Sequence, residues 1–324
     1  MRCYALATAW QRTGGTVSWF LAEAPSALEE RLEREGVQVS HRDTAPGSQE
    51  DAELLIAAAG RCDAAWTVVD GYRFTPAYVR RLKDAGLKIL CLDDDARFEF
   101  YAADIVLNQN ISATPGRYEK REKATQLLLG PQFVLLRPEF LAERPDRTHP
   151  KVGRKVLVTM GGSDPENVTA KVLRAIRRLR DECEARVVVG EGNPWKEELR
   201  LLAGSMRPQV QVEFSPPNMA PLMAWADVAI SGAGSTCWEL AYMGLPAILI
   251  ALSDDQRGVA DGIAQNQVGI SLGWHANVSE DTIADALQSL LHDPARRADL
   301  GERGQKLVDG RGAERVVDFL QKQI

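Results

Sequence analysis

Nearly unbroken apolar strands alternate with amphipathic helices along almost the whole chain of 324 residues. Residues 88–92 and 247–252 are examples of these strands, whereas residues 167–180 carry their large apolar side chains on one helix face. Strands that are apolar on both faces are typical of a parallel sheet covered by helices on both sides. The pattern therefore predicts an α/β fold built on parallel sheets.

The same pattern sets the expected order of elements. In the first half it predicts strands over residues 16–21, 37–40, 65–70, 88–92 and 105–107, and helices over residues 26–35, 49–60 and 75–85. In the second half it predicts strands over residues 155–160, 186–189, 210–214, 228–230 and 247–252, and helices over residues 167–180, 279–291, 294–306 and 313–323. Ser279 is the expected N-cap of its helix.

One segment interrupts the alternation. Residues 142–153, AERPDRTHPKVG, contain two prolines, much charge and little apolar content, which is typical of a linker between domains. A chain of this length also favours two cores over one. We therefore expect two Rossmann-like parallel-sheet domains, residues 1–146 and residues 150–324, that face each other across a cleft.

Composition narrows the class of protein. With 45% hydrophobic and 26% charged residues and a net charge of −6, the chain reads as a soluble globular protein that does not bind nucleic acid. It has no apolar run near the ~20 residues of a membrane helix and no signal peptide, so we expect a cytoplasmic protein. We also expect it to be a monomer. The five cysteines and four histidines form no metal-ligand pattern, which predicts reduced thiols and no bound metal.

Residues 231–246, SGAGSTCWELAYMGLP, form the clearest candidate for a binding loop. Gly232 and Gly234 let the backbone turn after a strand, and Ser235 and Thr236 are placed to cap the helix that follows. Free N–H groups at such a turn suit a phosphate group. Glu239, one turn further along, could accept hydrogen bonds from ribose hydroxyls.

A tight turn of an ordinary α/β protein is the alternative interpretation of this segment. It lacks the third glycine of the dinucleotide fingerprint and the Gly-Lys-Ser/Thr of a nucleoside-triphosphate loop. The remaining functional interpretation is a nucleoside-diphosphate site.

Motifs in both halves resemble one enzyme family. The segments VVDGYR, ILCLDDDA, ADIVLNQN, VTMGGSDPENVT, residues 231–246 and SDDQ occur in the order found in the UDP-2,4-diacetamido-2,4,6-trideoxy-β-L-altropyranose hydrolases of pseudaminic acid synthesis. The C-terminal half also resembles the UDP-GlcNAc-using glycosyltransferase of peptidoglycan lipid synthesis. Both resemblances imply the two-domain GT-B fold and a UDP-sugar as the small-molecule substrate, with no cofactor. The hydrolase resemblance implies attack of water at the anomeric carbon and loss of UDP with inversion.

The resemblance also implies roles for individual residues. The catalytic residues would be Tyr72 and Asp255. Those that bind UDP would be Gly161, Gly162, Ser163, Gly190, Met219, Gly234, Ser235, Thr236 and Glu239, and those that bind the sugar would be Asp94, Asn108 and Gln256. The alternatives are a packed Tyr72, an exposed loop carboxylate at Asp255 and a solvent-facing Glu239.

One departure from the family concerns the start of the sequence. The family opens with a strand and a glycine-rich loop ending in Gly-His before a helix that begins near Met-Arg-Cys, whereas this sequence starts with Met1-Arg2-Cys3. The first strand and the histidine expected as general base are therefore absent from these residues. Two alternative functions remain open: a UDP-sugar-dependent glycosyltransferase of cell-surface polysaccharide synthesis, and a catalytically inactive UDP-sugar binder.

Overall fold

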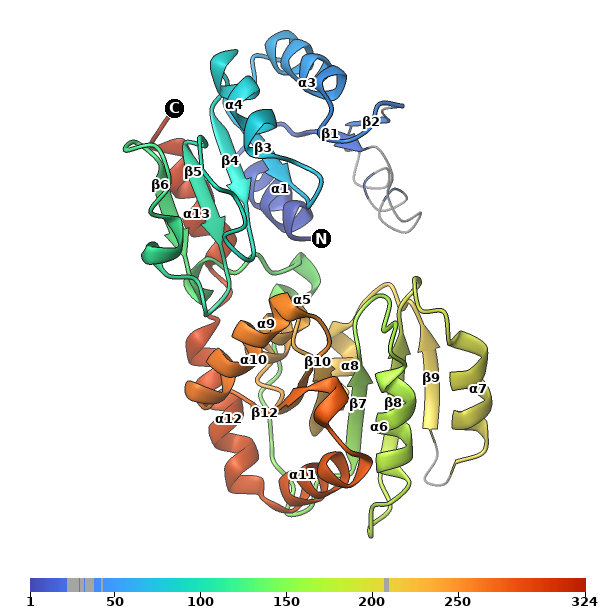
Figure 1. The fold of residues 1–324 in the computed structure, drawn as a ribbon. Coiled ribbons are helices and arrows are strands. Elements are labelled where there is room, and N and C mark those ends of the chain that lie inside the picture. The colour runs from blue at the N-terminus through green and yellow to red at the C-terminus, as the bar shows by residue number, and fades with distance from the viewer. Residues whose placement is uncertain (22–28, 30–31, 33–37, 42, 207–209) are drawn as a thin grey trace. The chain divides into compact units, whose positions relative to one another are not determined.

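The computed structural model describes residues 1–21, 29, 32, 38–41, 43–206 and 210–324. Its elements form two compact units built on parallel strands (Figure 1). Unit 1 comprises Met1–Arg137 and Arg311–Ile324, and unit 2 comprises Pro138–Gly310. The predicted α/β class is confirmed, whereas the helix predicted over residues 26–35 lies largely outside the described residues.

Unit 1 alternates strands and helices as the sequence pattern predicts. Its main elements are α1 (Arg2–Arg12), β1 (Ser18–Leu21), β2 (Gln38–His41), α3 (Gln49–Arg61), β3 (Thr67–Asp70), α4 (Pro76–Asp84), β4 (Ile89–Leu92), β5 (Ile105–Asn108), β6 (Gln126–Leu129) and α13 (Gly312–Gln321). Within the described residues its strands form two parallel sheets, β1–β2 and β3–β4–β5–β6.

Helices cover both faces of the four-stranded sheet. On one face Leu90 and Leu92 of β4 share a buried cluster with Leu6 of α1 and Val316 of α13. Figure 1 shows α1 and α13 beside this sheet. On the other face a second cluster joins the sheet to α3 and α4, including Leu82, which is fully buried. Burial on both faces is what the unbroken apolar strands predict.

Unit 2 contains the larger sheet. Its elements are α5 (Pro138–Ala142), β7 (Lys155–Thr159), α6 (Val168–Ile176), β8 (Glu184–Val189), α7 (Lys196–Gly204), β9 (Val210–Phe214), α8 (Ala220–Trp225), β10 (Val228–Gly232), α9 (Thr236–Tyr242), β11 (Ala247–Ala251), α10 (Asp254–Gln265), β12 (Ile270–Trp274), α11 (Glu280–His292) and α12 (Pro294–Leu307). The Ser279 hydroxyl accepts a hydrogen bond from the N–H of Thr282, which confirms the predicted cap of α11.

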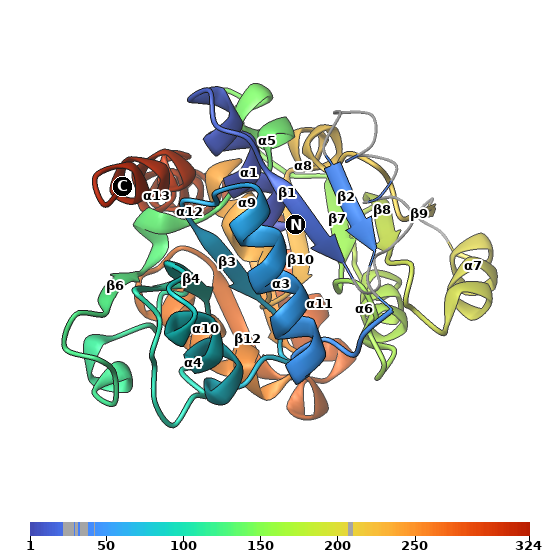
Figure 2. The same cartoon turned by 90° about the horizontal axis from the view of Figure 1, so that it is seen from above.

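The six strands of unit 2 are parallel and lie in the order β12–β11–β10–β7–β8–β9. Figure 2 shows β7, β8 and β9 following one another towards α7 at one edge of the sheet. The chain therefore fills one side of β7 first and then crosses to the other side with β10.

The C-terminal helix differs from its predicted place. The expected boundaries, residues 1–146 and 150–324, assigned it to the second domain, but α13 packs in unit 1. Its buried side chains Val316, Val317 and Leu320 complete the apolar cover of the four-stranded sheet. An amphipathic stripe shows that a helix packs, but not against which sheet it packs.

The segment predicted as an interdomain linker, residues 142–153, belongs to unit 2. Arg147 donates to the backbone carbonyls of Met243 and Ala226, both at 2.7 Å, and of Met223. Burial lowers the pKa of Arg147 to about 10, because removal of the guanidinium from water disfavours its charged form, and the negative charge of Asp227 only partly opposes this shift. Arg297, which is fully buried, similarly donates to the carbonyl of Pro150.

We expect Arg147→Met to lower the free energy of unfolding of unit 2 by about 2 kcal/mol, because three buried carbonyl groups lose a donor. Denaturant titration of the purified protein measures this change. Arg177→Met, which replaces an exposed arginine of the same unit, is the matched control and should have little effect. Equal stability of the two variants would contradict the anchoring role of Arg147.

Candidate functional site

The order of strands in unit 2 creates a switch point between β7 and β10. The chain leaves β7 towards β8 on one side, whereas β10 lies on the other side and leads to β11. Ligands of open parallel sheets bind at the carboxyl ends of the strands, where the direction of the connections reverses. The loops that follow β7 and β10 therefore flank the place where a ligand is expected.

The loop after β10 begins at Gly232 and leads into α9. Gly234 and Ser235 have no acceptor for their backbone N–H groups among the residues that the structure describes. Ser235 occupies the N-cap position, but its hydroxyl makes no capping hydrogen bond, which corrects the predicted capping role. The loop thus presents exposed polar groups, while Ala233 behind it is fully buried. Glu239 lies one turn into α9 and is half-buried.

The loop after β7 carries Gly161, with a positive φ of 83°, Gly162 and Ser163. A Cβ added to Gly161 or Gly162 would meet no atom within 4 Å. Space beside both glycines allows a ligand to approach the backbone closely.

Gly190, which follows β8, has a packing role. A Cβ at this position would lie 2.4 Å from the carbonyl oxygen of Gly162, so the glycine lets the loops after β7 and β8 touch. Met219, also predicted to bind UDP, occupies the N-cap position of α8, and only 9% of its surface is exposed.

Asp164 is a structural residue that the sequence analysis missed. Its carboxylate accepts hydrogen bonds from the N–H groups of Val168 (2.8 Å) and Thr169 (2.9 Å) and from the Thr169 hydroxyl (2.6 Å). The start of α6 is therefore capped by its own chain, and an anion at this loop would have to use residues 161–163. An aspartate shortly before a helix is the sequence signal that could have revealed this cap.

Gln256 and Asp255 lie in the first turn of α10, after β11. Asp255 is exposed, whereas Gln256 is half-buried. The Gln256 carbonyl oxygen, Oε1, accepts hydrogen bonds from the backbone N–H groups of Ala233 (3.1 Å) and Leu252 (3.0 Å). The residue predicted to bind the sugar thus also joins two neighbouring loops.

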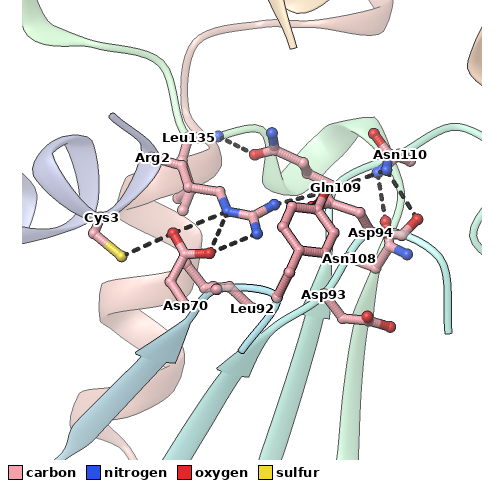
Figure 3. Close-up of polar contacts among 12 residues, drawn as sticks. Arg2, Cys3, Asp70, Leu92, Asp93, Asp94, Asn108, Gln109, Asn110 and Leu135 are labelled. Carbon is pink, nitrogen blue, oxygen red and sulfur yellow. Dashed lines mark hydrogen bonds and ion pairs between the residues drawn. The ribbon is translucent and has the colours of Figure 1, made fainter. Parts of the chain in front are cut away.

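Unit 1 has its own polar cluster at the carboxyl ends of β3 and β4, shown in Figure 3. The guanidinium of Arg2 lies between Asp70 and Asp94, with distances of 2.6 Å from Nη2 to Asp70 Oδ1 and from Nη1 to Asp94 Oδ1. Cys3 donates its thiol proton to Asp70 at 3.2 Å. Burial alone would raise the pKa of Asp70, but the hydrogen bond and positive charge of Arg2 outweigh it, so that pKa is lowered.

Asp94 links this cluster to Tyr72. Its Oδ2 accepts from the Tyr72 hydroxyl at 3.2 Å, and its backbone oxygen accepts from the Asn110 amide at 3.1 Å. Tyr72 is 65% exposed, which excludes the alternative in which it packs at the end of a strand. Asp94 therefore holds Arg2 and Tyr72 in place, and Tyr72 presents its ring to solvent beside the Arg97 guanidinium.

The structure corrects the predicted role of Asn108 as a sugar ligand. Asn108 is fully buried, donates to the Tyr118 hydroxyl at 2.7 Å and accepts from the N–H of Asn110 at 2.9 Å. Asp93 is also buried and accepts from the hydroxyls of Tyr101 and Tyr118. Both residues support the loops that carry the exposed side chains.

Two findings concern metal binding and membrane crossing by the described residues. They contain no group of three or more His, Cys, Asp or Glu side chains that could hold a metal ion. None of the helices described here is both long enough and apolar enough to cross a membrane.

Comparison with known proteins identifies the fold. Residues 156–311 match the model of the glycosyltransferase family 28 C-terminal domain. The crystal structure of Acinetobacter baumannii MurG superimposes with a TM-score of 0.69 at 15% identity, covering 99% of this chain and 95% of that one. The chain has the GT-B glycosyltransferase fold.

Curated relatives match part of the chain. The spore coat polysaccharide biosynthesis protein SpsG of Bacillus subtilis is 31% identical over 199 residues, which are 61% of this chain and 58% of that protein. The UDP-N-acetylglucosamine–N-acetylmuramyl-(pentapeptide) pyrophosphoryl-undecaprenol N-acetylglucosamine transferase of Caulobacter vibrioides is 26% identical over 182 residues, 53% of this chain and 50% of that protein. The matched part thus spans 58% and 50% of the length of these two relatives.

We expect Arg2→Met to destabilise unit 1 by about 2–3 kcal/mol at pH 7, because two partly buried carboxylates lose their cation. In the wild type the pKa of Asp70 is lowered, so its stabilising contribution is present at neutral pH and is lost as the pH falls through that pKa. In the variant, burial without Arg2 raises the pKa of Asp70. Protonation at low pH then removes the cost of a buried carboxylate that has no cation beside it. The difference in unfolding free energy between the wild type and Arg2→Met should therefore become smaller as the pH is lowered from 7 to 3.

Denaturant titrations at both pH values measure this difference. The control is the same substitution in an Asp70→Asn background, where the pH dependence should be much smaller. A destabilisation that is the same at pH 7 and pH 3 would show that Arg2 acts through packing alone.

Proposed function

We propose that this chain is a monomeric cytoplasmic hydrolase of a UDP-linked 2,4-diacetamido-2,4,6-trideoxyhexose. Its substrate would be UDP-2,4-diacetamido-2,4,6-trideoxy-β-L-altropyranose, and its products UDP and the free sugar used for pseudaminic acid synthesis. The observation that carries the nucleotide part is the pair of glycine loops at the β7–β10 switch point, within the region that matches family 28. The motif order of the sequence supports the hydrolytic part.

The leaving diphosphate would be held by backbone N–H groups. Residues 161–163 and residues 234–236 supply these donors from the two sides of the switch point. Donors fixed by the fold stabilise the negative charge that builds up as the bond to the anomeric carbon breaks. Glu239 would accept hydrogen bonds from the ribose hydroxyls, and Gly190 and Met219 would lie near the uracil.

The sugar would be bound by side chains that follow the ends of strands. Tyr72, held by Asp94, and Asp255 with Gln256 are the residues proposed for this part of the substrate. The water molecule needs a proton acceptor, and among the proposed residues the exposed carboxylate of Asp255 is the first candidate.

Transfer of the sugar to an acceptor is the second candidate function. The relative from Caulobacter vibrioides is named as a transferase, and the matched family model is described as a glycosyltransferase domain. The two activities differ in what attacks the anomeric carbon, water or an acceptor hydroxyl.

The decisive experiment incubates the full chain with the proposed substrate in ¹⁸O-labelled water. Hydrolysis at the anomeric carbon should release UDP without an acceptor and place ¹⁸O in the sugar rather than in UDP. The released sugar should show inverted anomeric configuration by proton NMR. Activity should persist in the presence of a chelator, because diphosphate binding is assigned to backbone groups.

Two glycine variants sharpen this test. The added methyl group of Gly234→Ala would meet only the Gln256 amide, at 3.5 Å, so the fold should tolerate it. It would occupy space beside the backbone N–H groups assigned to the diphosphate, and UDP release should fall at least about 100-fold. Gly204→Ala, at the end of α7 with open space around it, is the control and should keep full activity. UDP release that requires an added acceptor would favour transfer, and UDP binding without release would favour an inactive binder.

A further inference from the structure

Gln256 makes two hydrogen bonds to the backbone around the loop of residues 232–236, which is called the glycine loop below. One oxygen, Oε1, accepts two backbone N–H groups, from Ala233 in the loop after β10 and from Leu252 at the end of β11. Ala233 also donates to the carbonyl of Ile250, so its N–H is shared between two acceptors. For Leu252, Gln256 is the acceptor that the structure provides.

These contacts fix the position of one loop relative to the other. Without Gln256 the N–H of Leu252 would lose its acceptor, and a buried N–H group without an acceptor costs about 1–3 kcal/mol, whereas Ala233 would keep the carbonyl of Ile250. The carbonyl of Gln256 therefore joins the loop after β10 to the end of β11. A shorter side chain on α10 would not reach both donors.

The other end of the same amide faces the loop's open side. Gln256 Nε2 lies 3.5 Å from the place where a Cβ on Gly234 would stand. Among the described residues it has no hydrogen-bond acceptor. Since Oε1 is committed to backbone donors, the orientation of the amide is determined, and its N–H groups point to the region beside Gly234.

We propose that Gln256 is a positioning residue for the nucleotide site. Its carbonyl oxygen locks the glycine loop to the end of β11, and its amide N–H group donates to a diphosphate oxygen held by that loop. The proposal deepens the proposed function and rests on it for the identity of the ligand. It assigns Gln256 to the diphosphate as well as to the framework of the loop, whereas the sequence resemblance places it near the sugar.

Three variants of the full chain separate the two roles. Gln256→Met has a similar size but neither accepts nor donates a hydrogen bond. Gln256→Glu can still accept both backbone N–H groups, but it lacks the donor and adds a negative charge. Gln265→Met, on the exposed surface of the same helix, is the matched control.

The first readout is amide hydrogen exchange of Leu252 in the free protein, measured by NMR. Exchange should be at least about ten-fold faster in Gln256→Met and close to wild type in Gln256→Glu and Gln265→Met. The second readout is UDP affinity measured by calorimetry. Both Gln256 variants should bind UDP about ten-fold or more weakly, and the defect of Gln256→Glu should become smaller at high salt.

The two readouts decide the locking role and the donor role separately. Unchanged exchange of Leu252 in Gln256→Met would overturn the locking role. Wild-type UDP affinity in Gln256→Glu would overturn the donor role and leave Gln256 as part of the framework alone. Failure of the wild-type protein to bind UDP would instead contradict the proposed function, and the exchange data would still decide the locking role.

Discussion

Burial of parallel strands on both faces is the constraint on which the rest of this structure depends. Strands such as β7 and β10 have no exposed face to carry functional side chains, so polar groups gather in the loops at their carboxyl ends. Because β10 returns to the opposite side of β7, the loops after these two strands flank a switch point. The proposed nucleotide site follows from the topology before any single side chain is considered.

Polar interactions then fix the loops that the topology brings together. In unit 2 the anchors bind backbone groups rather than a side chain of opposite charge: Gln256 joins two loops, Asp164 caps α6, and Arg147 donates to backbone carbonyls. In unit 1 the anchor is ionic, because Arg2 neutralises part of the charge of Asp70 and Asp94. Each anchor is partly buried, which makes its geometry more definite than that of a surface ion pair.

Local signals in the sequence were sufficient for much of the fold. Unbroken apolar runs predicted the strands, and Ser279 predicted the start of α11. The GT-B fold implied by the resemblance is confirmed by the structural comparison. These features depend on short-range physics or on motifs that the sequence contains directly.

What escaped prediction depends on contacts between distant residues. The apolar stripe of α13 gave no indication that this helix packs in unit 1. The resemblance implied that Asn108 binds the sugar, but its side chain is fully buried and donates to the Tyr118 hydroxyl. The role of Arg2 requires Asp70 and Asp94 to be near it in space. Patterns of burial and spacing cannot supply such partners, which only the tertiary structure reveals.

The most direct test of the account is a map of where UDP binds, obtained by hydrogen–deuterium exchange with and without the nucleotide. The account predicts that UDP slows exchange in the segments containing residues 161–163 and 232–236, while the central segments of β4 and β5 in unit 1 remain unchanged. Protection confined to unit 1, or absent from both glycine loops at saturating UDP, would contradict the assignment of the nucleotide to the β7–β10 switch point.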